Sequence, residues 1–233
     1  MNPNEPAQAD INGVFSVPLV IAHHPSPEAL NSELRELFLR CTEEGDKHRN
    51  PTPFVYRNEA LYESNFSLFD WPQPAAQKLR EFCLTQLYQT VGELNGYGVD
   101  VLQKMHYSLE SWFHVTRKGG FFGAHNHPNH SWSGVYCVAH DGDDPASDSG
   151  KLVFLNPHAT STMYIDWATK NLKHPFSRSP LMLRLKPGQL VLFPSWLQHE
   201  VLPYEGDNLR ITVAFNARFR YSGEDVRRHA PTA

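Results

Sequence analysis

The segment GAHNHPNHSWSGVYCVA, residues 123–139, joins two short runs of strand-forming residues through a turn, and its first run carries two histidines two positions apart. Successive side chains of a strand point to opposite faces, so His125 and His127 share one face and can converge on one point. A third histidine, His199, follows the apolar run at residues 190–193 and the turn that begins at Pro194. A pair of ligands on one strand and a third ligand from a neighbouring strand can form a metal site in a barrel. Such a site keeps open coordination positions for other molecules.

Chance is the alternative explanation of the histidine pair, because the chain has 13 histidines among its 233 residues. A short motif is only a hypothesis until its structural context supports it. Here both flanks of the pair have strand character, and a second predicted strand directly precedes His199. The context therefore favours a metal site over a chance pair.

The chain changes character near residue 101, after which short β-prone runs alternate with turn clusters such as Gly119-Gly120 and Pro187-Gly188. The expected strands are residues 107–116, 121–127, 133–139, 151–155, 181–185, 189–193 and 209–219. Before this region we expect a strand at residues 13–22 and two amphipathic helices, one from Pro27 to about Cys41 and one from Pro74 to about Gly96. The pattern predicts a mainly β fold, a barrel or a sandwich, with the N-terminal helices packed outside it.

One domain is the expectation for a chain of this length. We assign residues 1–10 to a disordered N-terminus and residues 11–233 to a single domain. Within that domain, residues 11–100 supply the first strand and the helices, and residues 101–220 supply the barrel. Residues 158–180 have weak strand character, so we expect them to form an excursion from the barrel.

Composition argues against several classes of function. The formal net charge is −4 and no block of basic residues occurs, which argues against nucleic-acid binding. No window approaches the length of apolar sequence that spans a membrane, and the polar N-terminus lacks the features of a secretory signal, so a cytoplasmic protein is expected. Three widely spaced cysteines, Cys41, Cys83 and Cys137, indicate neither a disulfide framework nor a thiolate zinc site.

Arg210 and Thr212 form a second candidate site at the start of the last predicted strand. The two side chains share one face, and a buried guanidinium with a neighbouring hydroxyl suits a carboxylate ligand. Spacing alone also allows a different interpretation, in which Arg210 pairs at the surface with Glu200, Glu205 or Asp207.

Taken together, these segments resemble the Fe(II)/2-oxoglutarate oxygenase superfamily, and more narrowly a bacterial family of such oxygenases known mainly from genome annotation. The segments that carry the resemblance are Ser111-Trp112-Phe113, residues 123–128, residues 133–136, residues 150–154, Pro187-Gly188 through His199, and residues 210–216. The resemblance covers most of the chain, because the family also begins with a Phe-x-x-Pro strand, here Phe15–Pro18, and a helical part.

The resemblance implies a double-stranded β-helix, a jelly-roll or cupin-like barrel, with iron at its mouth and 2-oxoglutarate as co-substrate. By motif position, His125, His127 and His199 match the metal ligands and catalytic centre, and Arg210 with Thr212 matches the element that binds the distal carboxylate of 2-oxoglutarate. The chain departs from the superfamily at His127, where a carboxylate is usual. A three-histidine site, a two-histidine site completed by water and a third ligand elsewhere all stay open.

Tyr136, on the strand after the histidine pair, is a further candidate for a hydrogen bond to the co-substrate, against the alternative of a tyrosine buried in the barrel. The expected activity is hydroxylation of a small molecule or a peptide. Two other functions stay open: a three-histidine cupin-type dioxygenase that uses no 2-oxoglutarate, and a non-catalytic barrel that binds a metal or a small ligand. Many such folds form homodimers, so a homodimer is a further possibility.

Overall fold

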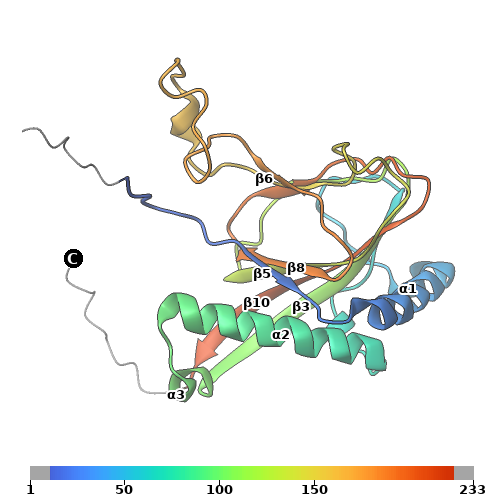
Figure 1. Cartoon of the computed structure of the whole chain (residues 1–233). Helices are drawn as coiled ribbons and strands as arrows, with labels where there is room; N and C mark the ends of the chain where they lie inside the picture. Colours follow the sequence, from blue (N-terminus) through green and yellow to red (C-terminus); the bar gives the residue numbers. More distant parts are fainter. Residues whose placement is uncertain (1–10, 223–233) are drawn as a thin grey trace, which may run out of the picture.

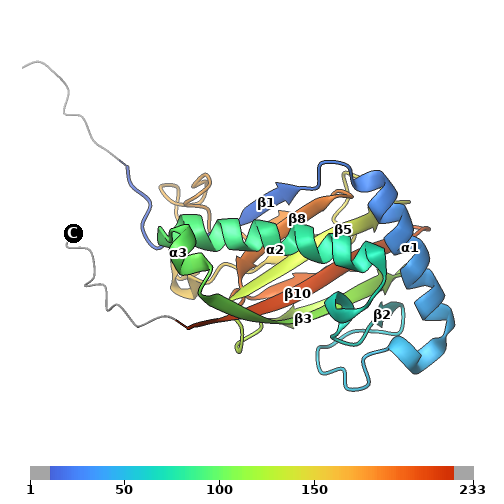
Figure 2. The ribbon, with the colours of Figure 1, turned by 90° about the horizontal axis from the view of Figure 1, so that it is seen from below.

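The computed structural model describes residues 11–222, without the side chains of residues 159 and 160. The predicted disorder of residues 1–10 lies outside the described residues. Two antiparallel sheets face each other, and two long helices cover the outer face of the larger one (Figures 1 and 2).

The larger sheet has six strands in the order β1-β8-β5-β10-β3-β2, and the smaller sheet has four in the order β4-β9-β6-β7. The larger sheet consists of β1 (Val20–His23), β2 (Leu61–Glu63), β3 (Met105–Thr116), β5 (Trp132–His140), β8 (Gln189–Pro194) and β10 (Arg210–Tyr221). The smaller sheet consists of β4 (Phe122–His125), β6 (Leu152–Phe154), β7 (Leu181–Leu183) and β9 (His199–Val201). This arrangement is a jelly roll, as the resemblance implied.

The helices are α1 (Pro27–Glu43), α2 (Pro74–Asn95) and the short α3 (Val99–Leu102), with single 3-10 turns at Gly45–His48, Leu68–Asp70 and Ala159–Thr162. Helix α1 begins at Pro27 as predicted, because proline tolerates the first helical position. Helix α2 ends at Gly96, which adopts a φ of 64° that a side chain would disfavour.

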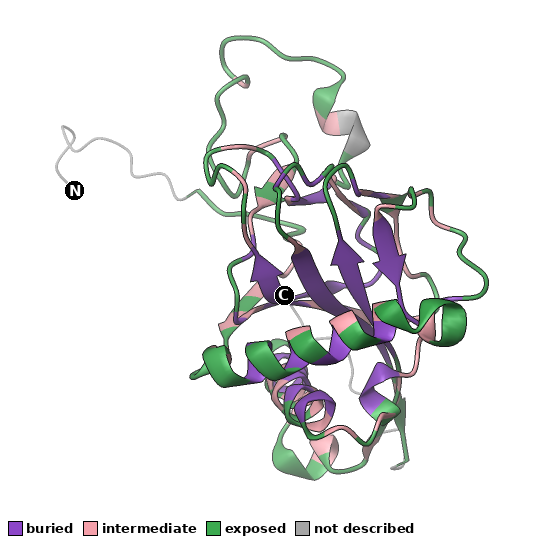
Figure 3. Ribbon diagram, turned by 90° about the vertical axis from the view of Figure 1, so that its right-hand side faces the viewer, coloured by how far each residue is buried: buried purple, intermediate pink, exposed green. Residues whose placement is uncertain are grey.

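The main hydrophobic core lies between the two long helices and the larger sheet (Figure 3). The rings of Phe38 on α1 and Phe113 on β3 stack with their centroids 4.1 Å apart. Strand residues alternate between faces, so Phe113 and Phe215 point to the helices while Trp112 and Ala214 point between the sheets. A second, smaller core between the sheets includes Cys137, and all three cysteines are buried and free.

The predicted strands are present from residue 105 onward, with shifted ends. Residues 13–19 are not part of a strand, which begins only at Val20, and the three-residue strands β2 and β9 were not predicted. Strand β4 ends at His125, so His127 lies in the following turn rather than on the strand with His125. The predicted excursion is confirmed: residues 158–180 connect β6 to β7 and extend away from both sheets (Figure 1).

Within residues 11–222, none of the helices has the length and apolar character that a membrane crossing requires.

Candidate metal centre and co-substrate pocket

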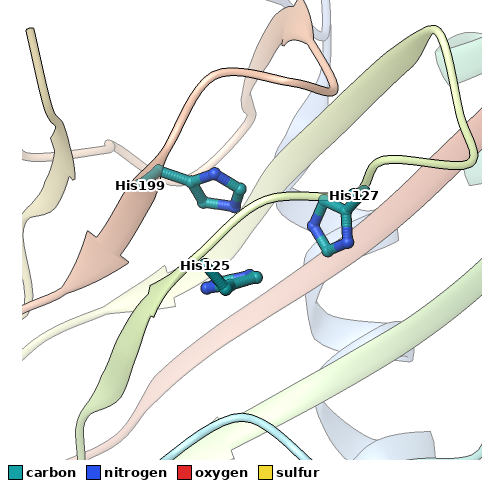
Figure 4. Close-up of side chains that lie close together, drawn as sticks. All are labelled: His125, His127 and His199. Carbon is teal, nitrogen blue, oxygen red and sulfur yellow. The ribbon is translucent and has the colours of Figure 1, made fainter. Parts of the chain in front are cut away.

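Three histidines from separate backbone segments meet at one end of the space between the sheets. His125 ends β4, His127 lies in the next turn, and His199 begins β9 directly opposite His125 in the strand register. One ring nitrogen from each lies within 4.8 Å of those of the other two. The three rings turn toward a shared space, as Figure 4 shows, and this is the geometry of a facial metal site.

Backbone carbonyls orient two of these rings. The Nδ1 atom of His125 lies 2.8 Å from the carbonyl oxygen of Gly123, and Nδ1 of His199 lies 2.9 Å from that of Leu197. A carbonyl oxygen only accepts hydrogen bonds, so Nδ1 carries the proton in both rings and Nε2 keeps its lone pair. His127 is fixed through its backbone instead, since its amide donates to the carbonyl oxygen of Ser195 at 2.9 Å. The hydrogen bonds therefore orient these histidines so that ring nitrogens with free lone pairs can bind a cation.

Burial keeps these imidazoles neutral. Desolvation, reinforced by the neighbouring histidines, lowers the pKa of His127 to about 3 and that of His199 to about 3. Desolvation also lowers the pKa of His125. Neutral imidazole is the form that binds a metal, so all three rings are ready to act as ligands at pH 7.

A small cavity of about 30 Å³ runs from the histidines toward Arg210 and Thr212 on β10. Arg210 is 1% exposed and Thr212 is 2% exposed. The Nε atom of Arg210 donates to the carbonyl oxygen of Gly150 at 2.9 Å, whereas its buried Nη1 has no hydrogen-bond partner among the described residues. The alternative that Arg210 pairs with a carboxylate at the surface is therefore wrong; Asp207, for example, accepts from Lys118 at 2.7 Å.

An unpaired N–H on a buried cation is costly, and it favours a ligand with an acceptor oxygen. A carboxylate supplies both the negative charge and the acceptor. Three neutral imidazoles and an unsatisfied guanidinium around the same cavity therefore fit a metal ion and a carboxylate co-substrate. The residues present thus suit Fe(II) together with 2-oxoglutarate.

Tyr136 is not part of this site, and its assignment to co-substrate binding has to be corrected. Its side chain points to the helix-covered face of the larger sheet, where its hydroxyl donates to Oδ1 of Asn31 on α1 at 2.8 Å. On β5 it is Ser133 and Val135, at the alternate positions, that line the cavity. The alternative of a buried tyrosine is the one that the structure supports.

Sequence reasoning missed several residues next to the histidines. Trp112 and His114 on β3 line the cavity from the larger sheet, and Glu63 on β2 contacts His114 through atoms 3.3 Å apart. A buried acidic residue in a short strand gives a weak signal in sequence, because a three-residue run shows no periodicity. Its position relative to His114 depends on the β2–β3 register, which only the fold reveals.

Two facing antiparallel sheets with a histidine cluster at the open end define the class of double-stranded β-helix metalloenzymes. Residues 110–216, which include the three histidines, Arg210 and Thr212, match the family model described as "Putative 2OG-Fe(II) oxygenase". A search of the curated proteins gave no match.

Solved structures support the same fold. A prolyl-4-hydroxylase of Pseudomonas putida is 20% identical with a TM-score of 0.58, over 89% of this chain and 94% of that chain. A prolyl hydroxylase of Trichoplax adhaerens, in complex with a hypoxia inducible factor peptide fragment, is 14% identical with a TM-score of 0.56, over 86% and 83%. HygX of Streptomyces hygroscopicus, with nickel, 2-oxoglutarate and hygromycin B bound, is 11% identical with a TM-score of 0.55, over 87% and 83%.

At these sequence identities the solved structures show the fold only. The match to the family model is the evidence for the activity. The match over residues 110–216 identifies the protein as a 2-oxoglutarate- and Fe(II)-dependent oxygenase. This agrees with the function, the fold and the cofactors expected from the resemblance.

Proposed function

We propose that His125, His127 and His199 are together the metal ligands of this oxygenase. The convergence of their ring nitrogens within 4.8 Å supports all three, His127 included, even though His127 follows the end of β4. Bound Fe(II) would supply the activation of oxygen, and the chain's own residues would hold the metal and its co-substrate in place.

Arg210 and Thr212 would hold the distal carboxylate of 2-oxoglutarate in the cavity that they share with the histidines. The observation that carries this assignment is the buried Nη1 atom of Arg210, which lacks a partner while it lines the same cavity as the three histidines. The hydroxyl of Thr212 lies two residues along the same strand face and can donate a further hydrogen bond. Phe193, Leu152 and Val201 line the cavity and keep water away from the bound acid.

The substrate would approach from the side of residues 50–66. A cavity of about 60 Å³ begins at His125 and His127 and is bounded by Asn50, Phe54, Val55, Phe66, Glu110 and Trp112, among others. This placement favours residues 43–63 as the loop that selects the substrate. Residues 156–180 instead line a separate groove of about 660 Å³. Hydroxylation of a small molecule or a peptide is the reaction we assign.

The rival three-histidine dioxygenase that uses no 2-oxoglutarate would also need a metal site of neutral ligands. It offers no acceptor for Arg210, which would stay buried and unsatisfied in every state of the enzyme. A non-catalytic binding barrel is disfavoured because residues 110–216 match an oxygenase family.

The test is an anaerobic titration of the metal-free protein with Fe(II) and 2-oxoglutarate, followed by visible absorption. We expect a band that needs both additions, that weakens in Arg210→Ala and that is lost in His127→Ala. Arg218→Ala is the matched control, because Arg218 lies on the same strand but is exposed. Bound iron without such a band would refute the role of Arg210 and support the dioxygenase that uses no 2-oxoglutarate.

The homodimer and the cytoplasmic location stay predictions.

A further inference from the structure

A buried carboxylate lies beside the three-histidine cluster. Glu63, on β2, is 3% exposed, and it pairs in register with His114 on β3. Its side chain lines the cavity that begins at His125 and His127. A carboxylate in the interior of a protein is unfavourable unless hydrogen bonds or charges offset its desolvation, so its position calls for a reason.

Two side chains bind this carboxylate, and a third lies beside it. Nδ2 of Asn50 donates to Oε2 at 2.7 Å, Nη1 of Arg57 pairs with the same oxygen, and Nε2 of His114 lies 3.3 Å from Oε1. Despite desolvation, these partners lower the pKa of Glu63 to about 2. Glu63 is therefore an anion fixed at one position in the site wall.

Arg57 and Glu63 form a buried ion pair, with side chains 9% and 4% exposed, but only Glu63 lines the histidine cavity. Glu63 shares the cavity with His125 and His127, whereas Arg57 is absent from that lining and instead borders a groove on the surface, formed by residues 46–61. Glu110 is the other carboxylate of the cavity, and half of its side chain is exposed. Arg57 offsets part of the charge of Glu63. Solvent screens the exposed Glu110 more strongly, however, so Glu63 is the carboxylate of this cavity that acts on His125 and His127 more directly.

Building on the three-histidine site proposed above, we propose that Glu63 supplies, from outside the ligand set, the negative charge that three neutral ligands lack. The usual iron site of such enzymes combines two histidines with one carboxylate. Here His127 takes the place where that carboxylate is expected, which leaves the site one charge more positive. Glu63 restores a nearby negative charge, and it acts as a positioning residue for the cation rather than as a ligand.

The simpler role for Glu63 is to anchor residues 50–57, because Asn50 and Arg57 both bind it. Anchoring predicts a loss of folding stability with little change in intrinsic metal affinity. The charge role predicts weaker metal binding with the same ligands. Glu63→Gln separates the two, because glutamine keeps the shape and an acceptor oxygen for Asn50 and Arg57 but removes the charge.

The experiment titrates Co(II) into the metal-free proteins and measures both the dissociation constant and the visible spectrum. Glu63→Gln is expected to bind Co(II) at least about 10-fold more weakly, the usual effect of losing a group that supports the ligands. Its spectrum should keep the wild-type shape, because the three histidines still bind the ion. Glu110→Gln, which removes a carboxylate from the same cavity, is the matched control and should bind like the wild type.

A second variant keeps the proposal testable if Glu63→Gln folds poorly. Arg57→Gln removes the cation that offsets Glu63, so the charge role predicts Co(II) binding as tight as in the wild type or tighter. An anchoring role predicts that Arg57→Gln weakens binding as Glu63→Gln does, and that result would overturn the proposal. Thermal unfolding of the metal-free variants measures the structural effect separately.

Two further outcomes overturn the proposal: equal affinities of Glu63→Gln and the wild type, and a changed Co(II) spectrum in Glu63→Gln, which would make Glu63 a ligand. Failure of the three-histidine site itself looks different. In that case His125→Ala would bind Co(II) as the wild type does, whatever the result at Glu63.

Discussion

Arg210 has a buried hydrogen-bond donor that stays unpaired within residues 11–222. Its guanidinium is buried, its Nε is satisfied by Gly150, and its Nη1 has no partner within the described residues. Burial lowers the pKa of Arg210, but arginine keeps its charge over the whole working range. Binding of an acid next to Nη1 would therefore relieve an existing unfavourable state, so 2-oxoglutarate bound there is expected to stabilise the fold.

Arg210→Lys is predicted to lose most of the stabilisation of the folded state that bound 2-oxoglutarate provides. At a concentration of one hundred times its dissociation constant, a ligand stabilises the folded state by about 2.7 kcal/mol. Lysine keeps the charge but cannot offer the planar pair of N–H groups, so the dissociation constant should rise by roughly tenfold or more. Thermal unfolding with Ni(II), with and without 2-oxoglutarate, measures the effect. An unchanged ligand-induced shift in Arg210→Lys would contradict the assignment.

The metal-free protein should lose stability in acid because of its buried histidines. His127 and His199 have folded-state pKa values of about 3, whereas an unfolded histidine has a pKa near 6.5. The folded state therefore resists protonation that the unfolded state accepts, so stability is full above pH 6.5 and falls as the pH drops toward 3. Each histidine contributes up to about 1.4 kcal/mol per pH unit inside this window.

Urea unfolding of the metal-free protein from pH 7 to pH 4 checks this dependence, and His199→Asn should show a shallower slope than the wild type. A slope that is the same in both proteins would show that His199 does not drive it.

At the scale of elements, the fold depends on close contact across the central strands β5, β8 and β10. Gly134 on β5 leaves room for the ring of Phe215: a Cβ at this position would lie 2.3 Å from Cε1 of Phe215 and 3.0 Å from Cδ2 of Leu192. Both neighbours belong to the core between the sheet and the helices. A side chain at residue 134 would therefore displace the main core and not the metal site.

Gly134→Ala is predicted to destabilise the protein by about 1–3 kcal/mol, the usual cost of overpacking a core. Gly13→Ala is the control, because the nearest atoms to a Cβ there lie 3.7 Å away and the residue is exposed. Chemical denaturation measures both free energies of unfolding. Equal stabilities of the two variants would mean that Phe215 moves aside without loss of packing.

The sequence predicted some elements much better than others, for physical reasons. Helices α1 and α2 are long enough to repeat an apolar face several times, so both their positions and their buried sides followed from the pattern. Strand β9 has three residues, too few for any periodicity, although His199 within it was found by its place after an apolar run. Which face Tyr136 occupies depends on how β5 packs between the helices and the second sheet, and no local pattern encodes that.

At the scale of the whole molecule, helices α1 and α2 share a single core with the six-stranded sheet. We propose on this basis that the described chain folds as one domain, as expected from its length. The three histidines, Arg210 and Thr212 were all predicted as site residues from spacing and resemblance, and the structure places them around one cavity. Glu63 and residues 50–66 were not assigned to the site, because their approach to it depends on the long-range pairing of β2 with β3.

The excursion formed by residues 158–180 is expected to be separable from the metal chemistry. Trp167 is 85% exposed on this segment, and it does not line the histidine cavity. Trp167→Ala should therefore change the free energy of unfolding by no more than about 0.5 kcal/mol and leave Co(II) and 2-oxoglutarate binding unchanged. Calorimetric titration of both ligands checks this, and a weakened 2-oxoglutarate affinity would connect the excursion to the site.

The register that sets His125 opposite His199 has one more consequence. A cation held by both residues would act as a reversible cross-link between two short strands that lie far apart in the chain, much as a disulfide closes a long loop. Loss of the ion would leave β9 held to β4 and β6 by a few backbone bonds and by the packing of His199 and Val201. Metal removal should thus expose this edge of the smaller sheet to proteases and speed amide exchange there, while the helix-covered core stays protected.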